Sequence, residues 1–193
     1  SAAASFNPGM KIIDQVIEPV VIHGTMTRKA AKVKALALFR ELALPNPDTI
    51  GDRFPHQVSG GQLQRLMTAM ALISDPEVVI LDEPTTALDV TTQVEVLKAF
   101  RRVVKQRGVT AIYVSHDLAV VAQMADRILV LLQGKIAEYG TTAHLIGAPQ
   151  ADYTRLLMDA AQQKERPSNW CQAKANELPL LEVRDLSAGY GPK

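Results

Sequence analysis

The chain has 193 residues and carries 21 Lys and Arg against 20 Asp and Glu, a formal net charge of +1. That balance gives no electrostatic case for binding nucleic acid or an anionic membrane. No apolar run approaches the roughly 18–20 residues needed to cross a bilayer. A lone cysteine, Cys171, excludes a disulfide framework and fits a reducing cytosol. The length suits one globular domain, or one domain plus part of another.

Two helices are expected in the first third of the chain. Residues 10–22 and 27–43 both carry apolar side chains at helical spacing, and Thr27 is a candidate N-cap for the second helix. The run Pro45-Asn46-Pro47 ends that helix. Its basic side chains favour a solvated helix surface over a nucleic-acid face; they are Lys29, Lys32, Lys34 and Arg40.

A third helix is expected to begin after Ser59. Ser59 and Gln62 have the spacing of a capping box, and an apolar stripe follows until Asp75-Pro76. Gly60 and Gly61 in the first turn would let backbone N–H groups approach a ligand closely. Such a helix start favours an anion such as phosphate. On this segment alone, an ordinary capped helix explains the residues as well.

An apolar strand and two carboxylates come next. Val78 to Leu81 carry no charge, which predicts a strand buried on both faces, as in a parallel sheet. Asp82 and Glu83 follow at its carboxyl end, where open α/β sheets bind their ligands. In P-loop NTPases an aspartate at this position helps to hold Mg²⁺. A buried strand followed by an acidic turn is the simpler alternative.

The segment from Asp89 to His116 predicts a helix and a second strand. Asp89 is a plausible N-cap for a helix that Gly108 ends. Residues 109–115 are rich in β-branched and aromatic side chains, which predicts a strand with His116 at its carboxyl end. We expect parallel strands alternating with helices over residues 76–140. His23, His56 and His144 lack a comparable position and are taken as structural.

Four segments in this order resemble the nucleotide-binding domain of ABC ATPases. They correspond to the signature motif (Ser59 to Gln62), the Walker B strand (Val78 to Glu83), the D-loop (Ala87-Leu88-Asp89) and the switch histidine (His116). Val58 stands where the family usually has leucine, which leaves the phosphate-facing residues unchanged. The resemblance implies an α/β, P-loop NTPase-like fold.

The resemblance also implies a mechanism that uses ATP and Mg²⁺. Two domains would enclose ATP head to tail, and the signature turn (Ser59, Gly60, Gly61 and Gln62) of one would meet the γ-phosphate held by the other. Asp82 would support the metal, Glu83 would polarise the attacking water and His116 would contact the γ-phosphate. Asp89 would help to couple the two sites.

One family motif is missing. No Gly-x-x-x-x-Gly-Lys-Ser/Thr phosphate loop occurs in the sequence. We therefore expect a partial domain, a helical subdomain plus a parallel-sheet core without the Walker A half, that does not hydrolyse ATP alone. The expected divisions are 1–75 (helical subdomain), 76–147 (RecA-like core), 148–178 (extension and linker) and 179–193.

The last division resembles the opening strand of a second nucleotide-binding domain, which implies a tandem ATPase. Tyr190 matches the aromatic residue that stacks on adenine there. Because an unpaired sheet edge invites strand addition, we expect the strand at 180–190 to fill an edge left open in its own chain or in a neighbour's.

Two further segments resemble the importers of oligopeptides, dipeptides and nickel: Phe54 to Gln57, and Pro149 to Leu157. This implies coupling of ATP hydrolysis to uptake of peptides or a related small solute. The implied partners are membrane subunits that contact the helical subdomain, a second nucleotide-binding domain and, indirectly, a periplasmic or extracellular binding protein. The implied location is peripheral, on the cytoplasmic face of the cell (inner) membrane.

Two alternatives remain. A soluble tandem ABC ATPase of translation or DNA repair is less consistent with Thr86-Ala87-Leu88-Asp89, where translation factors usually have Asn-His-Leu-Asp, and with the lack of coiled-coil heptads. The other is a folded, non-catalytic interaction module.

Overall fold

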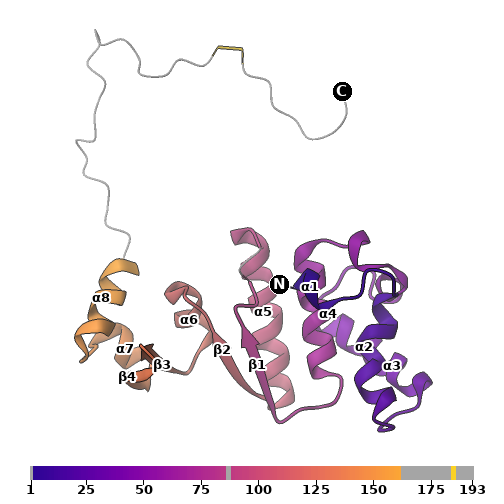
Figure 1. Cartoon of the computed structure of the whole chain (residues 1–193), viewed down its shortest axis with the longest axis horizontal. Helices are drawn as coiled ribbons and strands as arrows, with labels where there is room; N and C mark the ends of the chain where they lie inside the picture. The colour runs from indigo at the N-terminus through magenta and orange to yellow at the C-terminus, as the bar shows by residue number, and fades with distance from the viewer. Residues whose placement is uncertain (1, 86–87, 162–183, 186–193) are drawn as a thin grey trace. The chain divides into compact units, whose positions relative to one another are not determined.

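The computed structural model of the chain describes residues 2–85, 88–161 and 184–185 (Figure 1). Most of the expected strand at 180–190 lies outside these ranges, including Tyr190, as do Thr86, Ala87 and Cys171. Residues up to 161 form one compact unit. No helix in the described ranges is long and apolar enough to cross a membrane.

Helices dominate the first part of the chain, and short strands enter after residue 77. The helices are α1 (Ala2–Ser5), α2 (Ile12–Ile22), α3 (Arg28–Glu41), α4 (Gly60–Leu72), α5 (Val90–Arg107), α6 (Leu118–Met124), α7 (Thr142–Gly147) and α8 (Asp152–Ala161). The strands are β1 (Val78–Asp82), β2 (Thr110–Val114), β3 (Arg127–Leu132) and β4 (Lys135–Thr141), and two 3₁₀ turns, η1 (Ile50–Asp52) and η2 (Pro55–Gln57), precede α4.

The caps expected for α3 and α5 are present. Thr27 accepts a hydrogen bond from the Ala30 amide at the start of α3, and Asp89 accepts one from the Thr92 amide at the start of α5. Gly108 ends α5 with φ +66, a left-handed conformation that glycine adopts without steric cost. These helix boundaries follow from residues close together in sequence, which explains why the sequence predicted them.

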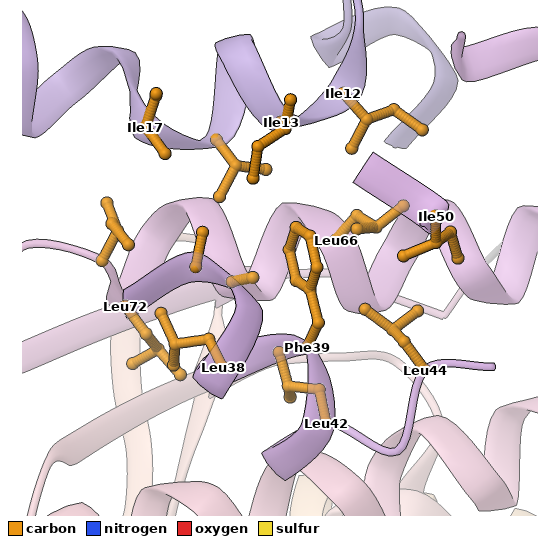
Figure 2. Close-up of a cluster of buried hydrophobic side chains, with 14 of the residues drawn as sticks. Ile12, Ile13, Ile17, Leu38, Phe39, Leu42, Leu44, Ile50, Leu66 and Leu72 are labelled. Carbon is orange, nitrogen blue, oxygen red and sulfur yellow. The ribbon is translucent and has the colours of Figure 1, made fainter. Parts of the chain in front are cut away.

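The largest buried cluster joins α2, α3, α4 and η1. Figure 2 shows apolar side chains from these elements meeting around Phe39, which is fully buried. The remaining labelled residues are Ile12, Ile13, Ile17, Leu38, Leu42, Leu44, Ile50, Leu66 and Leu72. Val103 of α5 belongs to the same cluster, so it extends to the helix that covers β1.

Strands β1 and β2 pair in parallel, with Ile80 opposite Ile112. Val79 and Leu81 are buried with Phe100 of α5. The prediction that β1 is buried on both faces is wrong, because the opposite face of the pair is exposed. Its apolar side chains are 47–67% exposed: Val78, Ile80, Ile112 and Val114.

The expectation of parallel strands throughout 76–140 is also wrong. β3 and β4 form a separate antiparallel pair. The reason is the two-residue connection: Gln133 and Gly134 have φ values of +51 and +76, as a tight hairpin turn requires, and so short a loop joins only antiparallel strands. The Gln-Gly pair between two apolar runs was the sequence signal for this hairpin.

Candidate functional site

The expected catalytic residues lie at the carboxyl ends of β1 and β2. Because the two strands are parallel, their carboxyl ends meet at the same edge, and Asp82 pairs with Val114 there. The Glu83 amide then donates a hydrogen bond to the Val114 carbonyl, 3.0 Å away. Glu83 itself has φ +44, so the chain turns sharply after the strand in a conformation that costs a non-glycine residue energy.

This edge brings Glu83 and His116 together across 33 positions of sequence. The His116 Nδ1 lies 2.8 Å from the Glu83 Oε1, while the two side chains are 73% and 44% exposed. The hydrogen bond and charge of Glu83 raise the pKa of His116 above its ordinary 6.5. The pair is therefore a solvent-accessible carboxylate whose orientation is fixed by an imidazole.

The signature turn forms the capping box that its sequence predicts. The Gln62 amide donates to the Ser59 Oγ at 3.3 Å, and the Ser59 amide donates to the Gln62 Oε1 at 3.1 Å. This reciprocal pair satisfies two of the amides at the start of α4. The Ser59 hydroxyl keeps its own hydrogen as a donor, so the turn can still bind an anion.

Gly61 occupies a position that the sequence did not explain. Gly61 is buried and faces α5, where a β-carbon on residue 61 would overlap the Thr92 side chain. The glycine is therefore required for close packing between α4 and α5, whether or not it approaches a ligand. A β-carbon on Gly60 would lie 3.4 Å from the Leu88 side chain, which is an ordinary fit.

Asp89 is an exposed helix cap at the start of α5. Its Oδ1 accepts the Thr92 amide at 3.0 Å. The hydrogen bonds from the Thr92 amide and hydroxyl lower the pKa of Asp89 below its ordinary value, so the carboxylate stays charged.

The buried hydroxyl of Thr85, which the sequence did not reveal, stabilises the segment that follows Glu83. Thr85 is buried, and its hydroxyl lies 3.4 Å from the Tyr113 hydroxyl and 3.2 Å from the Gln93 Nε2, which donates to it. Burial raises the pKa of Tyr113. These contacts tie the segment after Glu83 to both β2 and α5. No spacing rule would have found them, because the three residues meet only in the folded chain.

The donor set fits Mg²⁺ and a nucleotide phosphate. Asp82 and Glu83 are adjacent exposed carboxylates, and carboxylate oxygen is the ligand type that Mg²⁺ prefers. Mg²⁺ is commonly held by only one or two carboxylates, with water and phosphate oxygens completing its shell. Ser59 and the amides that start α4 provide donors of the kind that bind phosphate.

The parallel strand pair that ends in a carboxylate–histidine pair and the glycine-led capped helix are both features expected of an ABC-type ATPase domain. Residues 2–86 match the family described as ABC transporter. The chain is 28% identical to the bacterial ABC transporter cassette MJ0796, solved as a dimer, with a TM-score of 0.60 over 70% of this chain and 58% of that one.

Over most of its length the chain is similar to ATP-binding proteins of importers. It is 43% identical over 159 residues to the glutathione import ATP-binding protein GsiA of Escherichia coli K12. It is 42% identical over 154 residues to the dipeptide transport ATP-binding protein DppD of Bacillus subtilis. These matches include 82% and 80% of the chain, but only 26% of GsiA and 46% of DppD.

Proposed function

We propose that the protein carrying this chain binds and hydrolyses ATP to drive import of peptides or a related small solute, such as glutathione. The observation that carries the proposal is the Glu83–His116 pair beside Asp82 at the tips of two parallel strands. Glutathione import by GsiA and dipeptide transport by DppD support the solute class.

In this proposal Glu83 orients the attacking water and accepts its proton, as a positioned carboxylate can. His116 holds the Glu83 carboxylate by the 2.8 Å hydrogen bond and adds a donor toward the phosphate. When bound, ATP would supply the phosphoryl group, and Mg²⁺ would neutralise the charge on its phosphate oxygens. Asp82 would hold the metal, and the signature turn (59–62) would donate hydrogen bonds to phosphate oxygens.

We further propose that the site is completed by a second nucleotide-binding domain, with Asp89 coupling the two halves and Tyr190 stacking on adenine. In this proposal the domain boundaries fall after residues 75, 147 and 178. A complete ATP site also needs a phosphate loop, which these 193 residues do not contain. The assembled ATPase would contact membrane subunits through residues 1–75, on the cytoplasmic face of the membrane, and would act with a solute-binding protein.

The test replaces the carboxylate without changing its size. In the natural protein that contains this sequence, Glu83→Gln should lower ATP turnover by on the order of 10²- to 10⁴-fold, because proton transfer is lost. Binding of ATP should persist, since Glu83 is not proposed to hold the nucleotide. Turnover is measured by phosphate release and binding by a fluorescent ATP analogue.

Glu77→Gln is the matched control, because Glu77 is exposed and lies just before the opposite end of the same strand. Its turnover should equal that of the unmodified protein. A Glu83→Gln protein with unchanged hydrolysis would refute the catalytic assignment. Uptake of labelled dipeptide and glutathione by cells lacking the protein then tests the solute class.

A further inference from the structure

The contact between Gly61 and Thr92 links the two segments that the proposed mechanism places beside ATP. Gly61 lies in the first turn of α4, and Thr92 lies in the first turn of α5. A β-carbon on residue 61 would lie 3.7 Å from the Thr92 Cβ and 3.8 Å from the Val96 Cγ2, and it would collide with the Thr92 Cγ2 methyl. The methyl therefore occupies the space that any larger residue at position 61 would need.

Thr92 is fixed at its other end by Asp89. The Thr92 amide donates to the Asp89 Oδ1 at 3.0 Å, and the Thr92 side chain helps to lower the pKa of that carboxyl. One residue therefore touches the signature turn with its methyl group and the D-loop aspartate with its polar groups. Thr92 is half-buried and is in contact with both segments.

We infer that Thr92 is a positioning residue that fixes the signature turn (59–62) relative to Asp89. This inference rests on the proposed function, in which both segments meet bound ATP. Because the two helices pack without space between Gly61 and the Thr92 methyl, a shift of one helix start moves the other. Small displacements of such groups have large consequences for catalysis, on the order of 100-fold for about 1 Å.

The experiment uses the natural protein with Glu83→Gln, so that ATP is bound and retained. The readout is the ATP concentration that gives half-maximal closure of the two nucleotide-binding domains, measured by energy transfer between a fluorophore on each domain. Gly61→Ala should raise that concentration about tenfold, a coupling of the size found between side chains in contact.

Two substitutions at Thr92, each combined with Gly61→Ala, separate the effect of the Thr92 methyl from the effect of its hydroxyl. Thr92→Ser removes the methyl and keeps the hydroxyl, so Gly61→Ala with Thr92→Ser should recover most of the ATP response. Thr92→Val keeps a methyl and removes the hydroxyl, so Gly61→Ala with Thr92→Val should stay as impaired as Gly61→Ala alone. If Gly61→Ala fails to fold, Thr92→Ser by itself should still raise the half-saturating ATP concentration a few-fold, because the helix start loses its contact.

Equal behaviour of the two double variants would overturn the inference, since the effect would then come from Gly61 meeting the ligand directly. A fall in melting temperature with an unchanged half-saturating ATP concentration would also overturn it, because Thr92 would then be a packing residue only.

If the Glu83→Gln parent itself shows no response to ATP, the proposed function fails and the inference fails with it. If that parent responds to ATP but Thr92→Ser does not restore the response of Gly61→Ala, the inference fails and the proposed function stands.

Discussion

The carboxylate of Glu83 and the imidazole of His116 form a charge-assisted hydrogen bond in an exposed position. Glu83 raises the pKa of His116, first through the hydrogen bond and then through its charge. The favourable energy of the protonated pair is fully present below the ordinary histidine pKa of 6.5 and is lost as the pH rises through the raised value. The pair therefore keeps its charge further into the neutral range than an isolated histidine would.

Replacing Glu83 should lower the pKa of His116. In NMR titrations of the 193-residue chain, the His116 midpoint of the unmodified chain should exceed 6.5 and should fall toward that value in Glu83→Gln, because the carboxylate charge is removed. Spectra of the other three histidines should be the same in both chains, which provides an internal control. Equal His116 midpoints would show that the pair does not form in solution.

At the scale of an element, one side chain of the β3–β4 hairpin binds the backbone just before α8, beside the apolar packing of Tyr153 and Leu157 on the hairpin. The Glu138 carboxylate of β4 accepts the Gln150 amide at 2.9 Å and the Ala151 amide at 3.1 Å, immediately before α8 begins. The Gln150 amide is the main cause of a lowered pKa at Glu138. This attachment gives a physical role to the start of the Pro149–Leu157 segment that resembles the peptide importers.

Removal of this carboxylate should loosen α8. In Glu138→Ala, the amides of α8 should exchange with solvent several-fold faster, because two backbone donors lose their acceptor. Glu138→Gln retains one acceptor oxygen of the same reach and should show a smaller effect. Since the pKa of Glu138 is lowered, the attachment is present above the ordinary glutamate pKa and is lost as the pH falls through the lowered value, which exchange at acidic pH can measure.

At the scale of the whole molecule, stability is concentrated in the cluster formed by α2, α3 and α4. That cluster contains most of the fully buried large side chains among the described residues, whereas β1 and β2 bury only one face. Arg107 of α5 strengthens the connection between α5 and α3 through two hydrogen bonds of 2.9 Å to the Glu41 carboxylate. The strands that carry Glu83 and His116 are therefore supported mainly through α5.

Two apolar substitutions should show this asymmetry. Phe39→Ala, at the centre of Figure 2, should destabilise the 193-residue chain by about 3–5 kcal/mol, because it leaves a cavity in a fully packed cluster. Ile80→Ala, on the exposed face of β1, should change stability by no more than about 0.5 kcal/mol. Urea denaturation followed by circular dichroism measures both, and similar losses would contradict the assignment of the main core.

The sequence by itself determined the features that depend on neighbouring residues. Ser59, Thr27 and Asp89 begin helices and Gly108 ends one, because each acts on backbone groups within a few positions of itself. The four motifs in order also carried the resemblance to ABC ATPases, and the family match over residues 2–86 agrees with it. The Gln133-Gly134 turn is equally local, and it makes β3 and β4 antiparallel where parallel strands were expected up to residue 140.

Only the tertiary structure decided which distant residues meet. The contact of Glu83 with His116, the overlap that excludes a side chain at Gly61 beside Thr92, and the hydroxyl contact of Thr85 with Tyr113 join residues 28 to 33 positions apart. The exposure of one face of β1 is of the same kind. An apolar run indicates that burial of its side chains is favourable. Whether both faces are buried depends on which elements pack against the strand, because the hydrophobic effect is not directional.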